Sequence, residues 1–162
     1  MRGLSGCGIA VGVDPADSNL QLTEKLVAGL YTEAMLLADE ARSYFDDFGR
    51  DARDAMTPIA RVNFSCESLK VTTRLMHVVA WLLAQRASLG GRGEKVPPLA
   101  ALTPSDEASL APMPQEARIL IATSIDLYMR IIRLESRLAA AAPDPAIASP
   151  ALMLRQRLER AF

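Results

Sequence analysis

Residues 57–91 hold the longest stretch of the chain without an internal glycine or proline, and they read TPIARVNFSCESLKVTTRLMHVVAWLLAQRASLGG. Thr57 can cap a helix, and Pro58 suits its first position, where no amide donor is needed. Gly90 and Gly91 favour a helix end, because glycine adopts the left-handed conformation without a Cβ clash. These signals predict one helix over residues 58–89.

Two apolar rows follow this predicted helix at steps of three and four residues, which is the spacing of a helical stripe. We expect the first row to be its core stripe: Ile59, Val62, Cys66, Leu69, Thr73, Met76, Ala80, Leu83 and Ala87. The second row contains Phe64, Val71, Leu75, Val78, Leu82 and Leu89. A helix that is apolar on two sides must be covered from two sides, so at least two other elements should pack on it.

A polar row occupies the remaining arc of the helix and has two interpretations. It consists of Asn63, Glu67, Lys70, Arg74, His77 and Trp81. One interpretation is a solvated face on which Glu67 and Lys70 form a weak ion pair. The other is a partner-binding or dimer face, because Trp and Arg are enriched at interface hot spots. The six residues are therefore candidate partner-binding residues.

Two further long helices are expected, over about residues 19–48 and 114–142. Ser18 and Gln21 form a capping box before the first, and Pro114 opens the second. The apolar stripe of the first contains Leu22, Leu26, Gly29, Leu30, Leu37, Ala41, Tyr44, Phe45 and Phe48. The connector over residues 90–113 is rich in proline and glycine. A connector this long is either a mobile crossing over one end of the bundle or a functional segment.

The predicted fold is an all-α, antiparallel three-helix bundle over residues 18–142. We expect residues 1–17 to form a flexible leader and residues 143–162 a mobile tail with a possible short helix. The two later helices carry more apolar surface than a three-helix core needs. Because large exposed apolar patches are rare on monomers, we expect a homodimer.

Composition narrows the function more by exclusion than by any positive motif. The net charge is −1, so no charge field points to nucleic acid. A single histidine cannot form a histidine pair for a metal, and Cys66 has no plausible base at a neighbouring helical position. No apolar run approaches the about 20 residues that a membrane helix needs. We therefore expect a cytoplasmic non-enzyme with no catalytic residues, cofactor or metal and no membrane association.

The run from Asn63 to Ala87 resembles the core of the RcdA family, the "regulator of CtrA degradation". Residues 29–34 and 41–45 look like the same family, and the likeness extends over about residues 20–142. The resemblance implies a dimeric three-helix bundle that acts as an adaptor for the ClpXP protease. Such an adaptor binds accessory factors and protein cargo, and so controls the degradation of cell-cycle regulators. The alternative is a helical homodimer whose structural or regulatory protein-binding role is unrelated to proteolysis.

Overall fold

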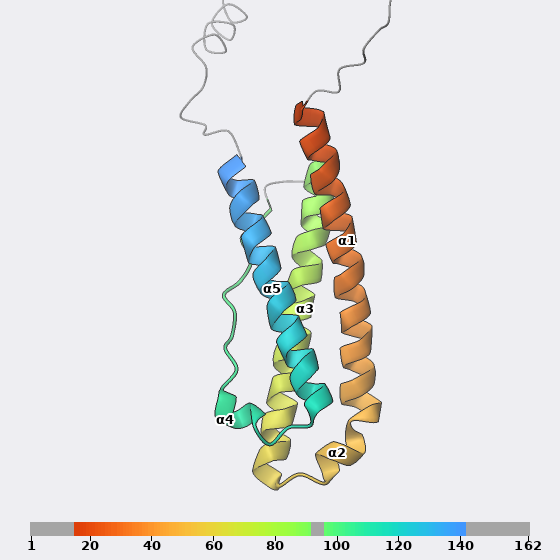
Figure 1. Ribbon diagram of the computed structural model, residues 1–162, viewed down its shortest axis with the longest axis vertical. Coiled ribbons are helices and arrows are strands. Elements are labelled where there is room, and N and C mark those ends of the chain that lie inside the picture. The colour runs from red at the N-terminus through yellow and green to blue at the C-terminus, as the bar shows by residue number, and fades with distance from the viewer. Residues whose placement is uncertain (1–14, 92–95, 142–162) are drawn as a thin grey trace, which may run out of the picture.

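Three long helices lie side by side in the computed structural model, which describes residues 15–91 and 96–141 (Figure 1). In chain order the elements are α1 (Pro15–Ser43), the π-helical turn η1 (Tyr44–Phe48), α2 (Arg50–Asp54), α3 (Pro58–Leu89), α4 (Glu107–Leu110) and α5 (Gln115–Ala141). The described part contains no strand, so the all-α three-helix bundle is confirmed. The predicted tail and all but the last three residues of the predicted leader lie outside the described residues.

The ends of α3 follow the local signals of the sequence. The hydroxyl of Thr57 accepts a hydrogen bond from the amide of Ala60 at 3.4 Å, and Pro58 begins the helix. At the other end Gly91 has a φ of 70°, where glycine avoids the strain that a side chain would bring. The start predicted for the first helix is wrong, because α1 begins at Pro15 and not after a cap at Ser18.

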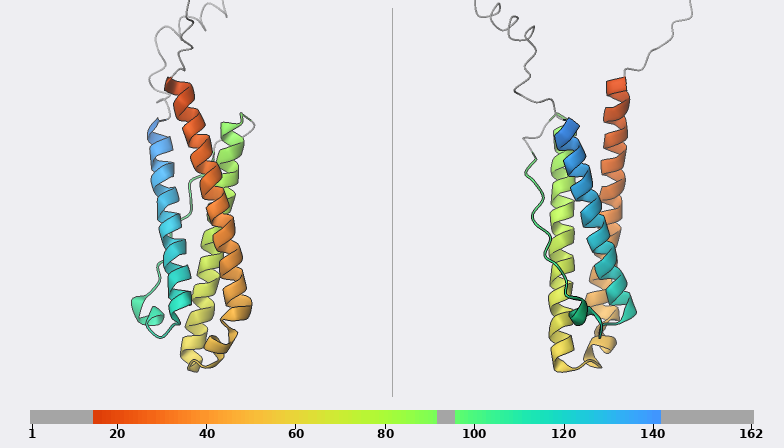
Figure 2. Two further views of the ribbon diagram at one scale, coloured as in Figure 1. Left: turned by 45° about the vertical axis from the view of Figure 1, so that its right-hand side comes forward. Right: turned by 60° about the vertical axis from the view of Figure 1, so that its left-hand side comes forward.

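The helix directions differ from the prediction in one respect. The view in Figure 2 shows α1 running opposite to both other helices, whereas α3 and α5 run in the same direction. The connector makes this possible, because its residues 96–110 run back along the length of the bundle toward the start of α3 (Figure 2). The expected crossing over one end is therefore wrong, and residues 96–110 are called the strap below.

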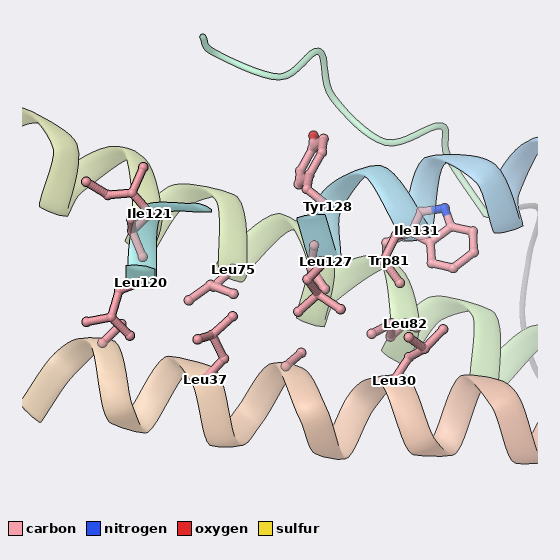
Figure 3. Packing of buried hydrophobic residues seen from close by; sticks show 14 of the residues in the cluster. Leu30, Leu37, Leu75, Trp81, Leu82, Leu120, Ile121, Leu127, Tyr128 and Ile131 are labelled. Carbon is pink, nitrogen blue, oxygen red and sulfur yellow. The ribbon is translucent and has the colours of Figure 1, made fainter. Parts of the chain in front are cut away.

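The core lies between the three helices and is almost entirely apolar (Figure 3). Leu30 and Leu37 of α1 point toward Leu75 and Leu82 of α3, and Leu127 of α5 lies between the helices (Figure 3). At the η1 end, the rings of Phe45 and Phe64 pack edge to face with centroids 5.2 Å apart. Arg130 of α5 and Glu33 of α1 form a bidentate ion pair, with N–O distances of 2.5 and 2.9 Å, and both side chains are partly exposed.

The structure covers only one of the two apolar rows of α3 that the sequence led us to expect as buried. The second apolar row, including Phe64, Val71 and Leu75, is buried in the core. The row expected to be the core stripe lies outside: Leu69 is 67% exposed and Met76 is 65% exposed. Both rows have helical spacing, so periodicity could not decide between them. The packing of α1 and α5 on the other faces of α3 decided it.

The predicted stripe of α1 is also partly wrong. Leu22, Leu26 and Phe48 are exposed, and the buried side consists of Val27, Leu30, Ala34, Leu37, Ala41 and Phe45. The π turn is one local cause, since its wider backbone turn changes the direction of the side chains that follow. It is closed by the Gly49 amide, which donates to the Tyr44 carbonyl at 2.7 Å. Phe45 thus points inward while Phe48 is 80% exposed.

Candidate functional site

The polar row of α3 lies at three different depths in the structure. Glu67, Arg74 and Trp81 are buried. Asn63 and Lys70 are half-buried, and His77 is exposed. The solvated-face interpretation is therefore wrong for half of the row. Trp81 belongs to the buried core cluster that also contains Ile131 of α5, which explains why so large a side chain occurs in this row.

The strap crosses this row and is fastened by side chains of both α3 and α5. The Glu135 carboxylate accepts from the Leu99 amide at 2.8 Å, and the Tyr128 hydroxyl donates to the Ala100 carbonyl. Figure 3 shows the buried Tyr128 ring pointing away from α1 and toward the strap. Farther along, Lys70 donates to the Pro104 carbonyl at 3.0 Å. The strap is thus an ordered part of the wall over the polar row.

Glu67 is only 2% exposed, yet both of its carboxylate oxygens have partners. Lys70 donates to one oxygen at 2.7 Å, and the Ser105 hydroxyl donates to the other at 2.6 Å. The Glu67–Lys70 pair predicted from the sequence is therefore present, but it lies under the strap instead of on a solvated surface. A buried carboxylate is tolerable when each oxygen is hydrogen-bonded.

Arg74 is less completely satisfied. It is 3% exposed, and its Nη1 donates to the Ser124 hydroxyl of α5 at 2.5 Å. Its Nη2 is buried and has no hydrogen-bond partner among the described residues. Burial lowers the pKa of Arg74, and the nearby Glu67 carboxylate opposes this shift in part. The guanidinium therefore has a buried N–H donor without a hydrogen-bond acceptor.

A small pocket of about 170 Å³ adjoins this guanidinium, between α3, the strap and Tyr128 of α5. Leu69, Leu102 and Tyr128 provide its apolar lining. Its polar lining comes from Lys70, Thr73, Arg74 and His77 of α3 and from Thr103 of the strap. Lys70, Arg74 and His77 belong to the polar row, and Thr73 is next to it in sequence. The pocket brings them close to residues of the strap and α5 that are distant in sequence.

Sequence reasoning missed four residues that complete this polar region: Ser105, Ser124, Tyr128 and Glu135. Of these four, only Ser124 could have been found from the sequence. A serine in an otherwise apolar row of α5 indicates a polar partner on a neighbouring helix. The other three act on the strap or from it. Their roles depend on the path of the strap, which no local pattern specifies.

The exposed apolar row of α3 forms a second surface. Ile59, Val62, Leu69, Met76 and Leu83 are all exposed large apolar residues, with the smaller Cys66, Thr73, Ala80 and Ala87 between them. These nine residues are called the α3 seam. Beside the seam, a groove of about 650 Å³ follows α1 and α3, lined by Arg42, Thr72 and Val79 among others.

Residues 15–91 and 96–141 contain neither a cluster of metal-ligating side chains nor a helix suited to crossing a membrane. No three His, Cys, Asp or Glu side chains gather there in a way that could hold a metal ion. None of the described helices combines the length and apolarity that crossing a bilayer requires.

Comparisons with known proteins place these surfaces in context. A family model described as "Protein of unknown function (DUF1465)" matches residues 18–162. Among solved structures, the crystal structure of RcdA from Caulobacter crescentus CB15 is 30% identical to this chain, with a TM-score of 0.59. The alignment covers 74% of this chain and 96% of the RcdA chain. No curated protein matches.

Proposed function

Because the chain belongs to the RcdA family, we propose that it is a cytoplasmic, non-enzymatic adaptor that tethers protein cargo and accessory factors to the ClpXP protease. The observation that carries this proposal is the 30% identity to RcdA across nearly the whole RcdA chain. The resemblance found in the sequence implies this role for the family. Through its cargo, such an adaptor would control the degradation of cell-cycle regulators.

The exposed surfaces support a protein-binding role. Exposed contiguous apolar surface on a soluble protein usually marks an interaction site. The α3 seam provides such a surface, and Phe48 adds a separate exposed ring at the η1 end. Of the six candidate partner-binding residues, we propose direct contact for Asn63, Lys70 and His77 only, because these three reach the surface.

We further propose that two copies associate through the α3 seam. Its residues alternate steps of three and four from Ile59 to Ala87, which is the seam pattern of a coiled coil. A second α3 presents a seam of the same length and chemistry, and a two-fold dimer pairs one patch with itself. The small residues Thr73 and Ala80 near the middle would allow the two helices to approach closely.

Disulfide trapping tests this dimer and gives its orientation. In an antiparallel pair, Thr73 at the midpoint of the seam meets its own copy, so Thr73→Cys combined with Cys66→Ser should cross-link under mild oxidation. In a parallel pair every seam residue meets its own copy, so native Cys66 should cross-link as well. A matched control places the new cysteine at exposed Thr123 of α5. Absence of any cross-link above this control would contradict the proposed seam.

A pull-down tests the adaptor role. Full-length protein immobilised on beads should enrich the ClpXP unfoldase or its accessory factors from a lysate of the source cells. The matched control is an unrelated three-helix bundle of similar charge. Equal recovery on both beads would contradict the adaptor role and favour the alternative, a helical homodimer with a structural or regulatory role unrelated to proteolysis. A positive cross-link combined with a negative pull-down would separate the two ideas.

A further inference from the structure

The region under the strap has an electrostatic imbalance. Glu67, the carboxylate that most influences Arg74, already receives donors from Lys70 and Ser105. No ion pair joins Arg74 to any carboxylate in the described part of the chain. One buried guanidinium thus keeps its positive charge and an unused N–H group next to a pocket.

We infer that this pocket binds one carboxylate group bearing a small apolar substituent, with Arg74 as its anchor. The guanidinium fork matches the geometry of a carboxylate, and a charge-assisted hydrogen bond is stronger where water is excluded. The Leu69 and Leu102 side chains and the Tyr128 ring provide apolar walls for the substituent. The binding site is independent of the proposed adaptor role, since it requires no protease.

Size and charge limit the ligand. A cavity of roughly 150 Å³ holds a benzene-sized molecule, so the 170 Å³ here suits a ligand of similar size. Lys70 is already paired with Glu67, so Arg74 offers the ligand one uncompensated positive charge. A single carboxylate therefore fits better than a phosphate dianion.

The strap gives the ligand a route to Arg74. Residues Ala101–Thr103 form part of the pocket wall; Ala101 and Thr103 are exposed, and Leu102 is only half-buried. The Nη2 atom is itself covered, so the ligand must displace this wall slightly or turn the guanidinium. A wall that is held by a few hydrogen bonds and little apolar burial opens at low cost.

Two sources could supply such a carboxylate: a free small acid, or the C-terminal residue of a protein chain. Titration calorimetry on the full-length protein separates them with matched probes. The small-acid arm compares isovalerate with its uncharged amide. The peptide arm compares a hexapeptide that ends in leucine with a free carboxylate against the same peptide with an amidated end.

We expect at least one carboxylate probe to bind and its amide counterpart to bind at least about tenfold more weakly, because the amide lacks the charge that pairs with Arg74. Arg74→Met, which keeps most of the side-chain volume, should weaken the carboxylate by a similar factor. The matched control is Arg133→Met, since Arg133 is an exposed arginine of α5. Circular dichroism checks that each variant is folded.

The outcomes divide clearly. Binding of isovalerate supports the pocket and shows that a free acid suffices, and binding of the free-ended peptide alone supports it with a protein terminus as the source. Equal binding of acid and amide to the native protein would overturn the inference even if Arg74→Met failed to fold. Binding of neither acid at millimolar concentration, or unchanged binding in Arg74→Met, would overturn it as well.

Discussion

Leu75 and Met76 are neighbours in sequence, yet they have opposite environments. Leu75 faces the core between α1 and α3, whereas Met76 lies on the α3 seam. The two residues differ little in size and apolarity, so the contrast isolates the effect of burial. Each was assigned to an apolar row from the sequence, but only the structure distinguishes the row that forms the core.

We predict that Leu75→Ala lowers the free energy of unfolding by about 2–5 kcal/mol, because it leaves a cavity in a packed core. Met76→Ala should change it by less than about 0.5 kcal/mol when the protein is dilute enough to be monomeric. Urea unfolding of both variants at one low concentration measures the difference. Similar losses in the two variants would mean that the assignment of the two rows is wrong.

Tyr128 makes stability sensitive to alkaline pH. Burial raises the pKa of Tyr128 above its ordinary value, although the positive charge of Arg74 lowers it in part. The folded state therefore holds the phenolic proton more tightly than the unfolded state does. This contribution to stability is fully present below about pH 10 and is lost as the pH rises further.

We predict that the free energy of unfolding falls above about pH 10 and that Tyr128→Phe falls less steeply. The variant should also lose about 0.5–1.5 kcal/mol at neutral pH, because the bond to the Ala100 carbonyl is missing. Urea unfolding at a series of pH values measures both effects. Burial also raises the pKa of Tyr44, so Tyr44→Phe is the appropriate comparison, and identical slopes in all three proteins would contradict the prediction.

Among the elements, η1 shows most clearly how one glycine supports a local irregularity. Gly49 closes the π turn against Tyr44. A Cβ added at this position would lie 2.8 Å from the Tyr44 carbonyl oxygen and 3.1 Å from Cε1 of its ring. A Cβ at Gly29, inside α1, would meet nothing within 4 Å. The two glycines thus occupy positions with opposite steric demands.

We predict opposite effects of alanine at these two positions. Gly49→Ala should destabilise the protein by about 1–3 kcal/mol, because the backbone of η1 must shift to relieve the contact. Gly29→Ala should stabilise it by about 0.5–1 kcal/mol, because alanine restricts the unfolded chain and favours the helix. Thermal unfolding followed by circular dichroism compares the two. A stabilising Gly49→Ala would show that η1 tolerates a side chain there.

The strap also determines how other elements are arranged. It returns the chain to the start of α3, so α5 runs parallel to α3 and presents Ser124 to Arg74. A short connector would have forced the opposite direction and a different set of facing residues. The polar region under the strap therefore depends on the path of the connector. The sequence alone did not show whether this connector is mobile or functional.

For the whole molecule, the dimer proposed through the α3 seam predicts that stability and assembly depend on protein concentration. We predict that Leu69→Glu with Met76→Glu raises the dissociation constant of the dimer by more than roughly 100-fold. The four carboxylates that the variant adds to the dimer would be desolvated in the interface without partners, at a combined cost above ~2.8 kcal/mol. Sedimentation velocity over a dilution series measures the shift.

The control for this experiment is Ile119→Glu, which also adds a charge at an exposed apolar position but lies on α5, away from the seam. It should leave the sedimentation coefficient unchanged. If the native protein is monomeric at high concentration, or if the double variant sediments like the native dimer, the proposed seam is not the interface.

The sequence by itself determined the features that depend on residues close together in the chain. Thr57, Pro58 and Gly91 act on their own turns, so the ends of α3 could be predicted. Helical spacing of apolar residues predicted the three long helices, and the motif of α3 predicted the family. These signals are local because caps, turns and periodicity each involve only a few neighbouring residues.

Only the tertiary structure decided which face of α3 is inside and what lies under the strap. Three rows on one helix share the same period, so no property of that helix alone selects among them. The choice depends on side chains that are distant in sequence: Ser105 for Glu67, and Ser124 for Arg74. A buried charge is stable only where such partners meet it, and their meeting is set by the path of the whole chain.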